Sequence, residues 1–244
     1  MITERMPKRD EDDLSMTFRT DSVPDPARSD VGAVSFGTWR VGTPERQRAT
    51  VDAIATAWEA RSWPSQGLRS YSVLAGTDGD TLLHYAQLAE ENTDHTPGQH
   101  QSWKNEVDAA VPGIERVGVI GCRLYRSNVV DGPTQDPGCI VLVTRVFDSP
   151  DPERARQLVD SLFSGSAEAP APPGLFSTHL YISTDGTRVL NYAQWISEQA
   201  HRTAIENVPQ VVEGNAQWRQ AHTWPGLTST TFQRFHVELH LTAP

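Results

Sequence analysis

The sequence predicts an α+β fold of two ferredoxin-like β-α-β-β-α-β repeats, whose sheets pack face to face within one chain. Three observations support this prediction. The chain has 244 residues, one stretch of it recurs after a constant shift of 107 positions, and both copies show the same order of strand and helix patterns. A chain of this length accommodates two domains of ordinary size. Each repeat then supplies one sheet.

The repeat is clearest where two hairpins are expected. The stretches GLRSYSVLAGTDGDTLLHYAQL (67–88) and GLFSTHLYISTDGTRVLNYAQW (174–195) are identical at ten of 22 positions without a gap. In both, an Asp-Gly pair lies between apolar runs, which is typical of a hairpin turn. The predicted units are a mobile N-terminal arm (1–30), a first ferredoxin-like repeat (31–130), a linker (131–136) and a second repeat (137–244).

Each repeat reads as four strands and two helices, because apolar residues alternate in the strands and recur at helical spacing in the helices. Thr43 followed by Pro44 is typical of a helix start. In the first repeat we expect strands at 34–41, 68–74, 81–88 and 116–126, and helices at 44–61 and within 99–110. In the second we expect strands at 139–147 and 230–241, a hairpin at 175–195, helices at 152–163 and 197–207, and a loop at 164–173.

A four-stranded sheet with helices on one side leaves its other side bare. Two such sheets cover each other when they pack face to face, usually by dimerisation. Here the second copy is part of the same chain, so we expect a monomer with an internal pseudo-dimer, or a homodimer of the whole chain.

Composition excludes several classes of protein. The 21 Lys and Arg against 31 Asp and Glu give a net charge of -10, which argues against a nucleic-acid binder. No apolar run approaches the ~18 residues of a membrane span, and the charged amino terminus does not resemble a signal peptide. Cys122 and Cys139 are too few for a Cys-based zinc site and are predicted to be buried thiols. We expect a cytoplasmic protein that handles small molecules.

The order of elements, the hairpin with its acidic Gly turn, and a strand carrying Asn191 and Trp195 resemble the antibiotic biosynthesis monooxygenase family. The resemblance covers residues 33–242 and implies a dimeric α+β barrel. It also implies that Asn191 and Trp195 line a substrate cleft, as an Asn and a Trp at this spacing do in the anthrone oxygenases of this family. Two-copy members resemble the ring-opening oxygenases of angucycline pathways, which use reduced flavin (FADH2 or FMNH2) supplied by a separate reductase.

The two copies differ from each other at these positions. The first repeat carries His84 and Leu88 where the second carries Asn191 and Trp195, so we expect one working site, in the second repeat. The haem-degrading branch of the family is disfavoured. It needs an Asn on the first strand, which 139–147 lacks, and a His about ten residues after the Trp, whereas His201 is six residues on.

Asn191 and Trp195 lie on one face of their predicted strand, about 13 Å apart at ~3.3 Å per residue. This spacing suits a flat polycyclic substrate, which would stack on the indole and hydrogen-bond to the amide. The alternative is that Trp195 is an ordinary core residue and Asn191 a polar group at a strand end.

The last strand alternates apolar and polar residues. Phe235, Val237, Leu239 and Leu241 form one predicted face and Arg234, His236, Glu238 and His240 the other. Arg234 and His236 are therefore candidates for a base or an anion stabiliser, unless the polar face is a solvated sheet edge. A metal site formed by His236, Glu238 and His240 is disfavoured, because residues four apart on one strand lie ~13 Å from each other. His179 and Tyr181 are further candidates for substrate binding.

The sequence lacks a Rossmann fingerprint, a cluster of ligands for iron and a nucleophile elbow. We therefore expect no tightly bound cofactor, O2 as co-substrate, and an oxygenase that tailors a polycyclic aromatic polyketide. The reaction is either quinone-forming hydroxylation or flavin-hydroquinone-dependent C–C cleavage of an angucyclinone. The alternatives are a non-catalytic polyketide-binding protein and a polyketide cyclase on the same barrel.

Overall fold

The structure is a computed structural model that describes residues 22–63, 67–89, 97–130, 135–167, 170–206, 220 and 223–243. Both repeats have the predicted order of elements. The first contains β1 (Ala33–Arg40), α1 (Pro44–Glu59), β2 (Leu68–Gly76), β3 (Thr81–Leu88), α2 (Pro97–Ala110) and β4 (Glu115–Val129). The second contains β5 (Cys139–Phe147), α3 (Pro152–Ala167), β6 (Leu175–Ser183), β7 (Arg188–Trp195), α4 (Glu198–Glu206) and β8 (Leu227–Thr242).

The first helix of each repeat begins in the same way. The Thr43 hydroxyl accepts a hydrogen bond from the Arg46 N–H (3.3 Å), and the Asp151 carboxylate accepts one from the Arg154 N–H (2.9 Å). A proline follows each capping residue, where its missing N–H costs nothing. The helix α3 extends to Ala167, into the predicted loop at 164–173, because no helix-breaking proline occurs before Pro170.

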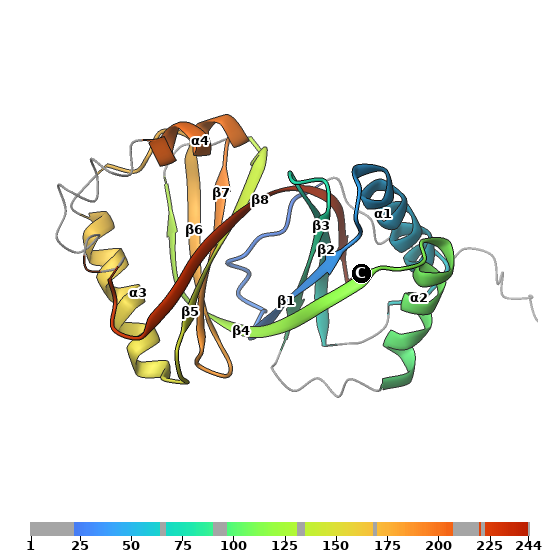
Figure 1. The fold of residues 1–244 in the computed structure, drawn as a ribbon, viewed down its shortest axis with the longest axis horizontal. Helices are drawn as coiled ribbons and strands as arrows, with labels where there is room; N and C mark the ends of the chain where they lie inside the picture. Colours follow the sequence, from blue (N-terminus) through green and yellow to red (C-terminus); the bar gives the residue numbers. More distant parts are fainter. Residues whose placement is uncertain are drawn as a thin grey trace, which may run out of the picture.

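The eight strands close into one barrel in the order β1-β3-β2-β8-β5-β7-β6-β4 (Figure 1). The long strands β4 and β8 join the two halves. β4 pairs first with β1 and then with β6, while β8 pairs first with β5 and then with β2. The predicted face-to-face sheets are confirmed, and one chain forms an internal pseudo-dimer.

Aromatic residues of both repeats meet inside the barrel. Tyr85 and Tyr192, which occupy equivalent positions in the repeat, stack with ring centroids 5.2 Å apart. The Tyr85 hydroxyl lies 3.0 Å from that of Tyr181. Around them are further buried residues of this interior: Val34, Phe36, Leu74, Leu83, Cys122, Ile140, Leu190 and Phe235. The tyrosine of the repeated Tyr-Ala-Gln therefore builds the contact between the two sheets.

The glutamines of the same triplet hold a segment near the amino terminus. The Gln87 side chain donates a hydrogen bond to the Asp25 carbonyl (2.7 Å), and Gln194 donates one to the Pro24 carbonyl (3.5 Å). Figure 1 shows this segment running between the two sheets. Equivalent side chains of the two repeats thus bind one shared stretch of chain.

The sequence predicts a mobile arm over residues 1–30, and the structure differs for the part from residue 22 onward. Pro24 and Pro26 are buried, and the Pro26 carbonyl accepts a hydrogen bond from the Tyr181 hydroxyl (3.3 Å). Polar side chains inside the barrel need partners, and this segment supplies carbonyl oxygens. Residues 1–21 lie outside the described residues.

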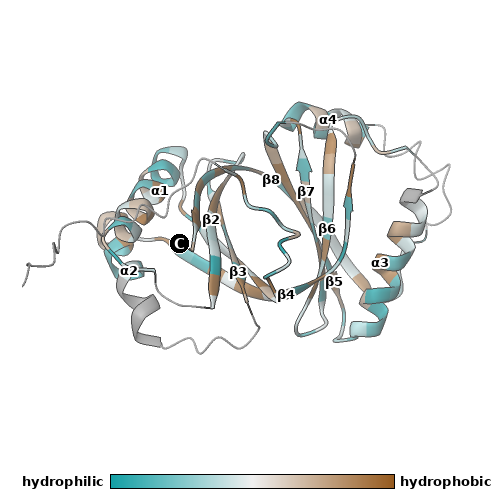
Figure 2. Cartoon of the chain, turned by 180° about the vertical axis from the view of Figure 1, so that it is seen from behind, coloured by the Kyte–Doolittle hydropathy of each residue, from teal (hydrophilic) through white to brown (hydrophobic). Residues whose placement is uncertain are grey.

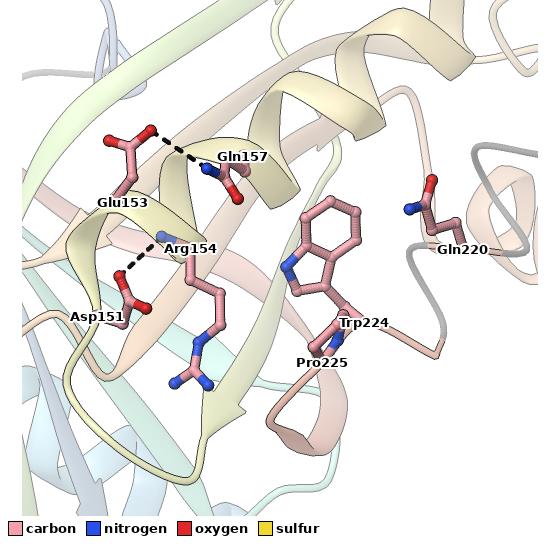
Figure 3. A pocket seen from close by; sticks show the side chains of 7 residues that line it. All are labelled: Asp151, Glu153, Arg154, Gln157, Gln220, Trp224 and Pro225. Carbon is pink, nitrogen blue, oxygen red and sulfur yellow. Dashed lines mark hydrogen bonds between the residues drawn. The ribbon is translucent and has the colours of Figure 1, made fainter.

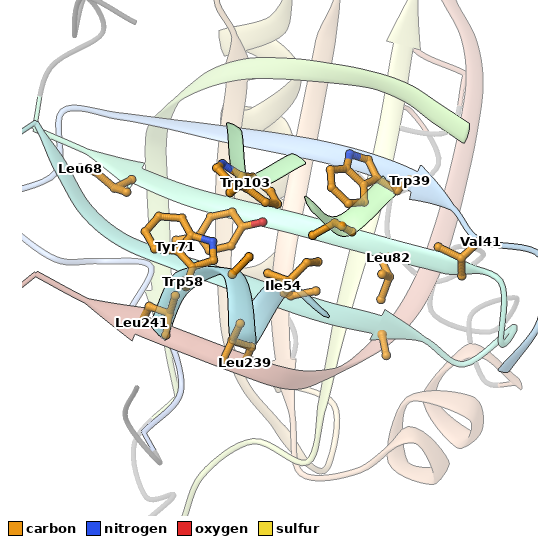
Figure 4. Packing of buried hydrophobic residues seen from close by; sticks show 14 of the residues in the cluster. Trp39, Val41, Ile54, Trp58, Leu68, Tyr71, Leu82, Trp103, Leu239 and Leu241 are labelled. Atoms are coloured by element: carbon orange, nitrogen blue, oxygen red, sulfur yellow. The ribbon is translucent and has the colours of Figure 1, made fainter. Parts of the chain in front are cut away.

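The helices cover the outer side of each sheet, but they cover the two sheets differently. In the first repeat one continuous cluster contains Trp39, Trp58, Tyr71 and Trp103 among its large side chains (Figure 4). In the second repeat the buried apolar residues form two separate clusters, one around Leu158 of α3 and one around Trp195. Much of the hydrophobic colour in Figure 2 lies on the strands between these helices.

The strand β8 does not keep one apolar face. Phe235 contributes to the barrel interior, with Val237 packed against it, whereas Leu239 and Leu241 belong to the helix-facing cluster of the first repeat. The register with β2 shifts between Val237 and Leu239, and such a bulge reverses the alternation of side chains. The prediction that these four residues share a face is therefore wrong. His240 is buried, and its Nδ1 lies 2.8 Å from the Ser72 hydroxyl.

Candidate functional site

The helix-facing side of the second-repeat sheet carries Asn191 and Trp195. Asn191 pairs with Val143 of β5, which pairs in turn with Phe232 of β8. Trp195 pairs with Cys139, at the other end of the same face. Since neighbouring strands fix these positions by backbone hydrogen bonds, the two side chains are held by the sheet and not by a loop.

His201 of α4 closes one end of this face. Its ring contacts Trp195 edge to face, with centroids 5.0 Å apart, and contacts Phe232 in the same way at 5.4 Å. Arg234 of β8 donates a hydrogen bond from Nε to His201 Nδ1 (2.9 Å), and its guanidinium lies 5.1 Å from the Phe232 ring. Trp195 and His201 are 6 % and 7 % exposed. Two strands, β7 and β8, and the helix α4 thus contribute to a single aromatic and basic group.

The hydrogen bond from Arg234 fixes the protonation of His201. An arginine can only donate, so His201 Nδ1 is unprotonated and the neutral ring carries its proton on Nε2. Burial lowers the pKa of His201 to about 4, and the nearby charges of Arg234 and Arg202 add to this effect. At neutral pH the imidazole is therefore a hydrogen-bond donor and a weak base.

Asn191 and Trp195 each carry a polar atom that has no partner among the described residues. These atoms are the side-chain oxygen of Asn191 and the indole nitrogen of Trp195, both buried. Buried polar groups are nearly always hydrogen-bonded in native proteins. One is an acceptor and the other a donor, so together they can bind a ligand that carries both a hydroxyl and a carbonyl oxygen.

The other predicted residues lie outside this aromatic and basic group, although His236 follows Arg234 by two residues on β8. His236 is exposed, and its Nδ1 lies 2.9 Å from the Gly138 carbonyl, which can only accept, so Nε2 is left unprotonated in the neutral ring. Tyr181 and His179 are buried on the barrel side of β6, opposite the face that carries Asn191. The two nitrogens of His179 each lie 2.9 Å from a serine hydroxyl. The structure therefore places Asn191, Trp195 and Arg234 on one face of the sheet and Tyr181 and His179 on the other.

Sequence reasoning missed two residues of this face, His201 and Arg145. His201 was considered only as a haem ligand, although its position three residues into a helix that follows Trp195 turns it toward the sheet. Arg145 is the only charged residue of β5, and it follows the alternation of the helix-facing residues Val141 and Val143. A single charge in an otherwise apolar strand is the signal that would have found it.

The equivalent face of the first repeat is filled. His84 occupies the position of Asn191, and its Nδ1 lies 2.6 Å from the Tyr71 hydroxyl. The His84 ring lies 4.1 Å from that of Trp39, which stacks in turn on Trp103 at 5.8 Å. Burial lowers the pKa of His84 to about 3, with further lowering by Lys104 and Arg116. Indole rings occupy this face (Figure 4), and its histidine is neutral at neutral pH.

A surface hollow lies at the start of α3, lined by Asp151, Glu153, Arg154, Gln157, Gln220, Trp224 and Pro225 (Figure 3). None of the predicted site residues lines it. Its polar side chains bond among themselves, for example Gln157 to Glu153 at 3.4 Å. We assign it no role.

No group of three or more His, Cys, Asp or Glu side chains in the described ranges is arranged to hold a metal ion. In the same part of the chain, no helix is both long enough and apolar enough to cross a membrane.

Comparison with known proteins places this architecture among solved structures. A structure described as an anthrone oxidase-like protein matches with a TM-score of 0.66 and 16 % identity, over 88 % of this chain and 94 % of that one. The fold is that of an anthrone oxidase-like barrel. The two chains match over nearly their whole lengths, so the tandem arrangement is shared.

Two further structures have the same fold. A candidate monooxygenase from Fusobacterium nucleatum matches with a TM-score of 0.55 and 9 % identity, over 88 % of this chain and 96 % of that one. A candidate monooxygenase from Lactobacillus acidophilus matches with a TM-score of 0.54 and 10 % identity, over 86 % and 96 %. No protein-family model and no curated protein matches the sequence.

Proposed function

We propose that this chain is an oxygenase that acts on a polycyclic aromatic polyketide, with one active site on the helix-facing side of the second repeat. The observation that carries the proposal is the group formed by Asn191, Trp195 and His201, which combines a flat aromatic wall with unpartnered polar atoms. The likeness of the fold to proteins described as anthrone oxidase-like and as monooxygenases supports the class of reaction.

Each residue has a distinct task in this proposal. Trp195 and His201 contact the rings of the substrate, and the Asn191 amide hydrogen-bonds to a substrate oxygen. Arg234 holds His201 through Nε and contributes a positive charge that stabilises a deprotonated substrate. His236, whose Nδ1 is engaged by the Gly138 carbonyl, presents Nε2 as the proton acceptor.

The chemistry that fits these residues draws its electrons from the substrate. A proton leaves the CH2 carbon of an anthrone-type ring, and the resulting carbanion passes an electron to O2. The oxygen then adds at that carbon, and loss of water leaves a carbonyl group. In sum, CH2 and O2 give C=O and H2O, which balances without an added reductant. The protein orients the substrate and assists deprotonation.

Flavin-dependent ring opening is the competing chemistry within the same class. It requires a flavin hydroquinone (FADH2 or FMNH2) delivered by a separate reductase, which would then be a partner of this protein. The two chemistries differ in one requirement: the first proceeds with substrate and O2 alone, and the second stops when reduced flavin is withheld.

Oxygen uptake tests the proposal. Purified protein is given anthrone or an angucyclinone, with and without reduced flavin, and product is followed alongside O2. Uptake that depends on the protein and falls in Asn191→Ala supports the proposal, and the flavin requirement selects the chemistry. Thr43→Ala is the control, because it changes a helix cap far from this face.

Two other functions give different results in the same assay. A binding protein for a reactive intermediate would bind the substrate without oxygen uptake, and Asn191→Ala would not affect product formation. A cyclase would form its product equally well under nitrogen. Absence of turnover with and without flavin contradicts the oxygenase proposal.

A further inference from the structure

Arg145 occupies an unusual place for a charged residue. It lies on β5 opposite Val189 of β7 and Thr230 of β8, on the face that points toward the helices. Along the strand its neighbours on the same face are Val143 and Phe147, which belong to the two separate apolar clusters of the second repeat. The guanidinium is therefore inserted where the apolar packing of this repeat is interrupted.

This arginine is buried without a counter-ion among the described residues. It is 8 % exposed, and its Nη1 is buried with no hydrogen-bond partner. Burial alone lowers its pKa to about 10, so the group is still charged at neutral pH. Two acidic side chains of the same repeat, Asp148 and Asp160, are paired with other arginines, Arg154 and Arg126.

A buried charge without a partner destabilises a fold, and removing such a charge is often neutral or stabilising. The chain has a net charge of -10, so acidic residues are plentiful, yet none that the structure describes is placed against this arginine. The same site in the first repeat, opposite Leu82 on β1, holds Trp39 instead. The fold therefore accepts an apolar residue at this position and does not need the charge.

Asn191 is a diagonal neighbour of Arg145. Asn191 pairs with Val143, two residues before Arg145 on the same face, which places the two β-carbons at roughly 7 Å. One ligand can therefore reach both side chains. An arginine presents several donors in a plane, which matches a carboxylate or another anionic oxygen.

We propose that Arg145 binds an acidic oxygen, a phenolate or a carboxylate, on the aromatic ligand of the second repeat. This inference rests on the proposed function and narrows its substrate to anionic aromatic compounds. The acidic oxygen of the ligand then acts as the counter-ion of Arg145, since the described residues provide none. Asn191 binds a second oxygen of the same molecule.

The test is binding of three non-reactive tricyclic probes, measured by isothermal titration calorimetry. Anthraquinone-2-carboxylate and 2-hydroxyanthraquinone each offer an acidic oxygen, and anthraquinone-2-carboxamide is the neutral control. Wild-type protein is expected to bind at least one acidic probe tenfold or more tightly than the amide. The acidic probe that is preferred identifies the oxygen as carboxylate or phenolate.

Two variants assign the preference. Arg145→Met is expected to abolish it, leaving the amide affinity within twofold, and to raise the melting temperature of the ligand-free protein. Arg156→Met removes one charge from the exposed surface of α3, where Arg156 pairs only with Glu153. It is expected to leave both binding and melting temperature unchanged.

Three results would overturn the inference: no preference for an acidic probe in the wild type, a preference that survives in Arg145→Met, or no binding of either acidic probe. If Arg145→Met does not fold, Arg145→Gln takes its place, because it removes the charge and keeps a polar side chain, and it is likewise expected to abolish the preference. None of these results depends on turnover. Oxygen uptake with anthrone tests the proposed function separately, so either proposal can fail while the other stands.

Discussion

The two repeats share a fold but differ on the side of each sheet that faces the helices. In the first repeat one continuous apolar cluster built on Trp39, Trp58 and Trp103 fills that side. In the second the apolar residues divide into two clusters, with Asn191 and Arg145 between them. Fusion into one chain allows such divergence, because a substitution in one copy is no longer imposed on the other. The filled copy stabilises the barrel and leaves the second free to carry polar residues.

Making the second repeat resemble the first has the largest expected effect. Trp195→Leu introduces the residue that the first repeat has at this position, Leu88. We expect kcat/KM for oxygen uptake with anthrone to fall about 100-fold, since the substrate loses the ring that orients it. Leu88→Met is the matched control in the first repeat and should retain full turnover. If Trp195→Leu retains turnover and Leu88→Met loses it, the active site lies in the first repeat and not in the second.

Exchanging Asn191 and His84, which occupy equivalent positions, separates an effect on turnover from an effect on stability. Asn191→His should lower kcat/KM by roughly tenfold to a hundredfold, because a hydrogen bond to the substrate is worth about 1–3 kcal/mol in a buried site. His84→Asn should leave turnover unchanged. It should lower the free energy of unfolding by about 1–3 kcal/mol, because the buried Tyr71 hydroxyl loses its partner. Urea denaturation gives the free energy of unfolding, and oxygen uptake on the same samples gives kcat/KM. An equal loss of turnover in Asn191→His and His84→Asn would contradict the difference between the repeats.

Acid should destabilise both repeats through their buried histidines. Burial lowers the pKa of His84 to about 3 and that of His201 to about 4, from an ordinary value of 6.5. Below 6.5 the unfolded chain therefore binds protons that the folded chain does not. The stabilising contribution is present in full above pH 6.5, and it is lost as the pH falls from 6.5 toward 4.

Melting temperatures between pH 7.5 and pH 4.5 measure this effect. His201→Gln and His84→Gln should each reduce the slope of melting temperature against pH below 6.5. A slope that neither substitution changes would show that other groups control the acid response.

The smallest effects should be equal in the two repeats. Thr43→Ala and Asp151→Ala remove the caps of α1 and α3, which have the same geometry. Each should lower the free energy of unfolding by about 1 kcal/mol and leave kcat/KM unchanged. A loss of turnover in Asp151→Ala alone would instead give the hollow at the start of α3 a part in the reaction.

Much of this fold can be predicted from the sequence, because duplication repeats every signal. The Asp-Gly turns, the Thr43-Pro44 helix start and the period of apolar residues occur in matching places and give each repeat its order of elements. The bulge between Val237 and Leu239 could not be predicted, since the residues alternate without interruption there. It arises because one long strand serves two sheets.

The candidate site was predicted only in part, for a related reason. Asn191 and Trp195 follow from the alternation within one strand, and Arg234 from the next. His201 reaches the same face from a helix, and Arg145 from a strand that is distant in sequence. Tyr181 and His179 were grouped with them by their residue types, yet strand pairing turns both into the barrel. Which faces meet depends on how strands pair, and one strand alone does not show it.

The number of ligands bound per chain tests most directly whether the two repeats differ in function. Anthrone is titrated into the protein under anaerobic conditions, where it cannot be consumed. The account predicts one anthrone per chain for the wild type and none for the double variant Asn191→His with Trp195→Leu. Two anthrones per wild-type chain, or binding that persists in the double variant, would contradict it.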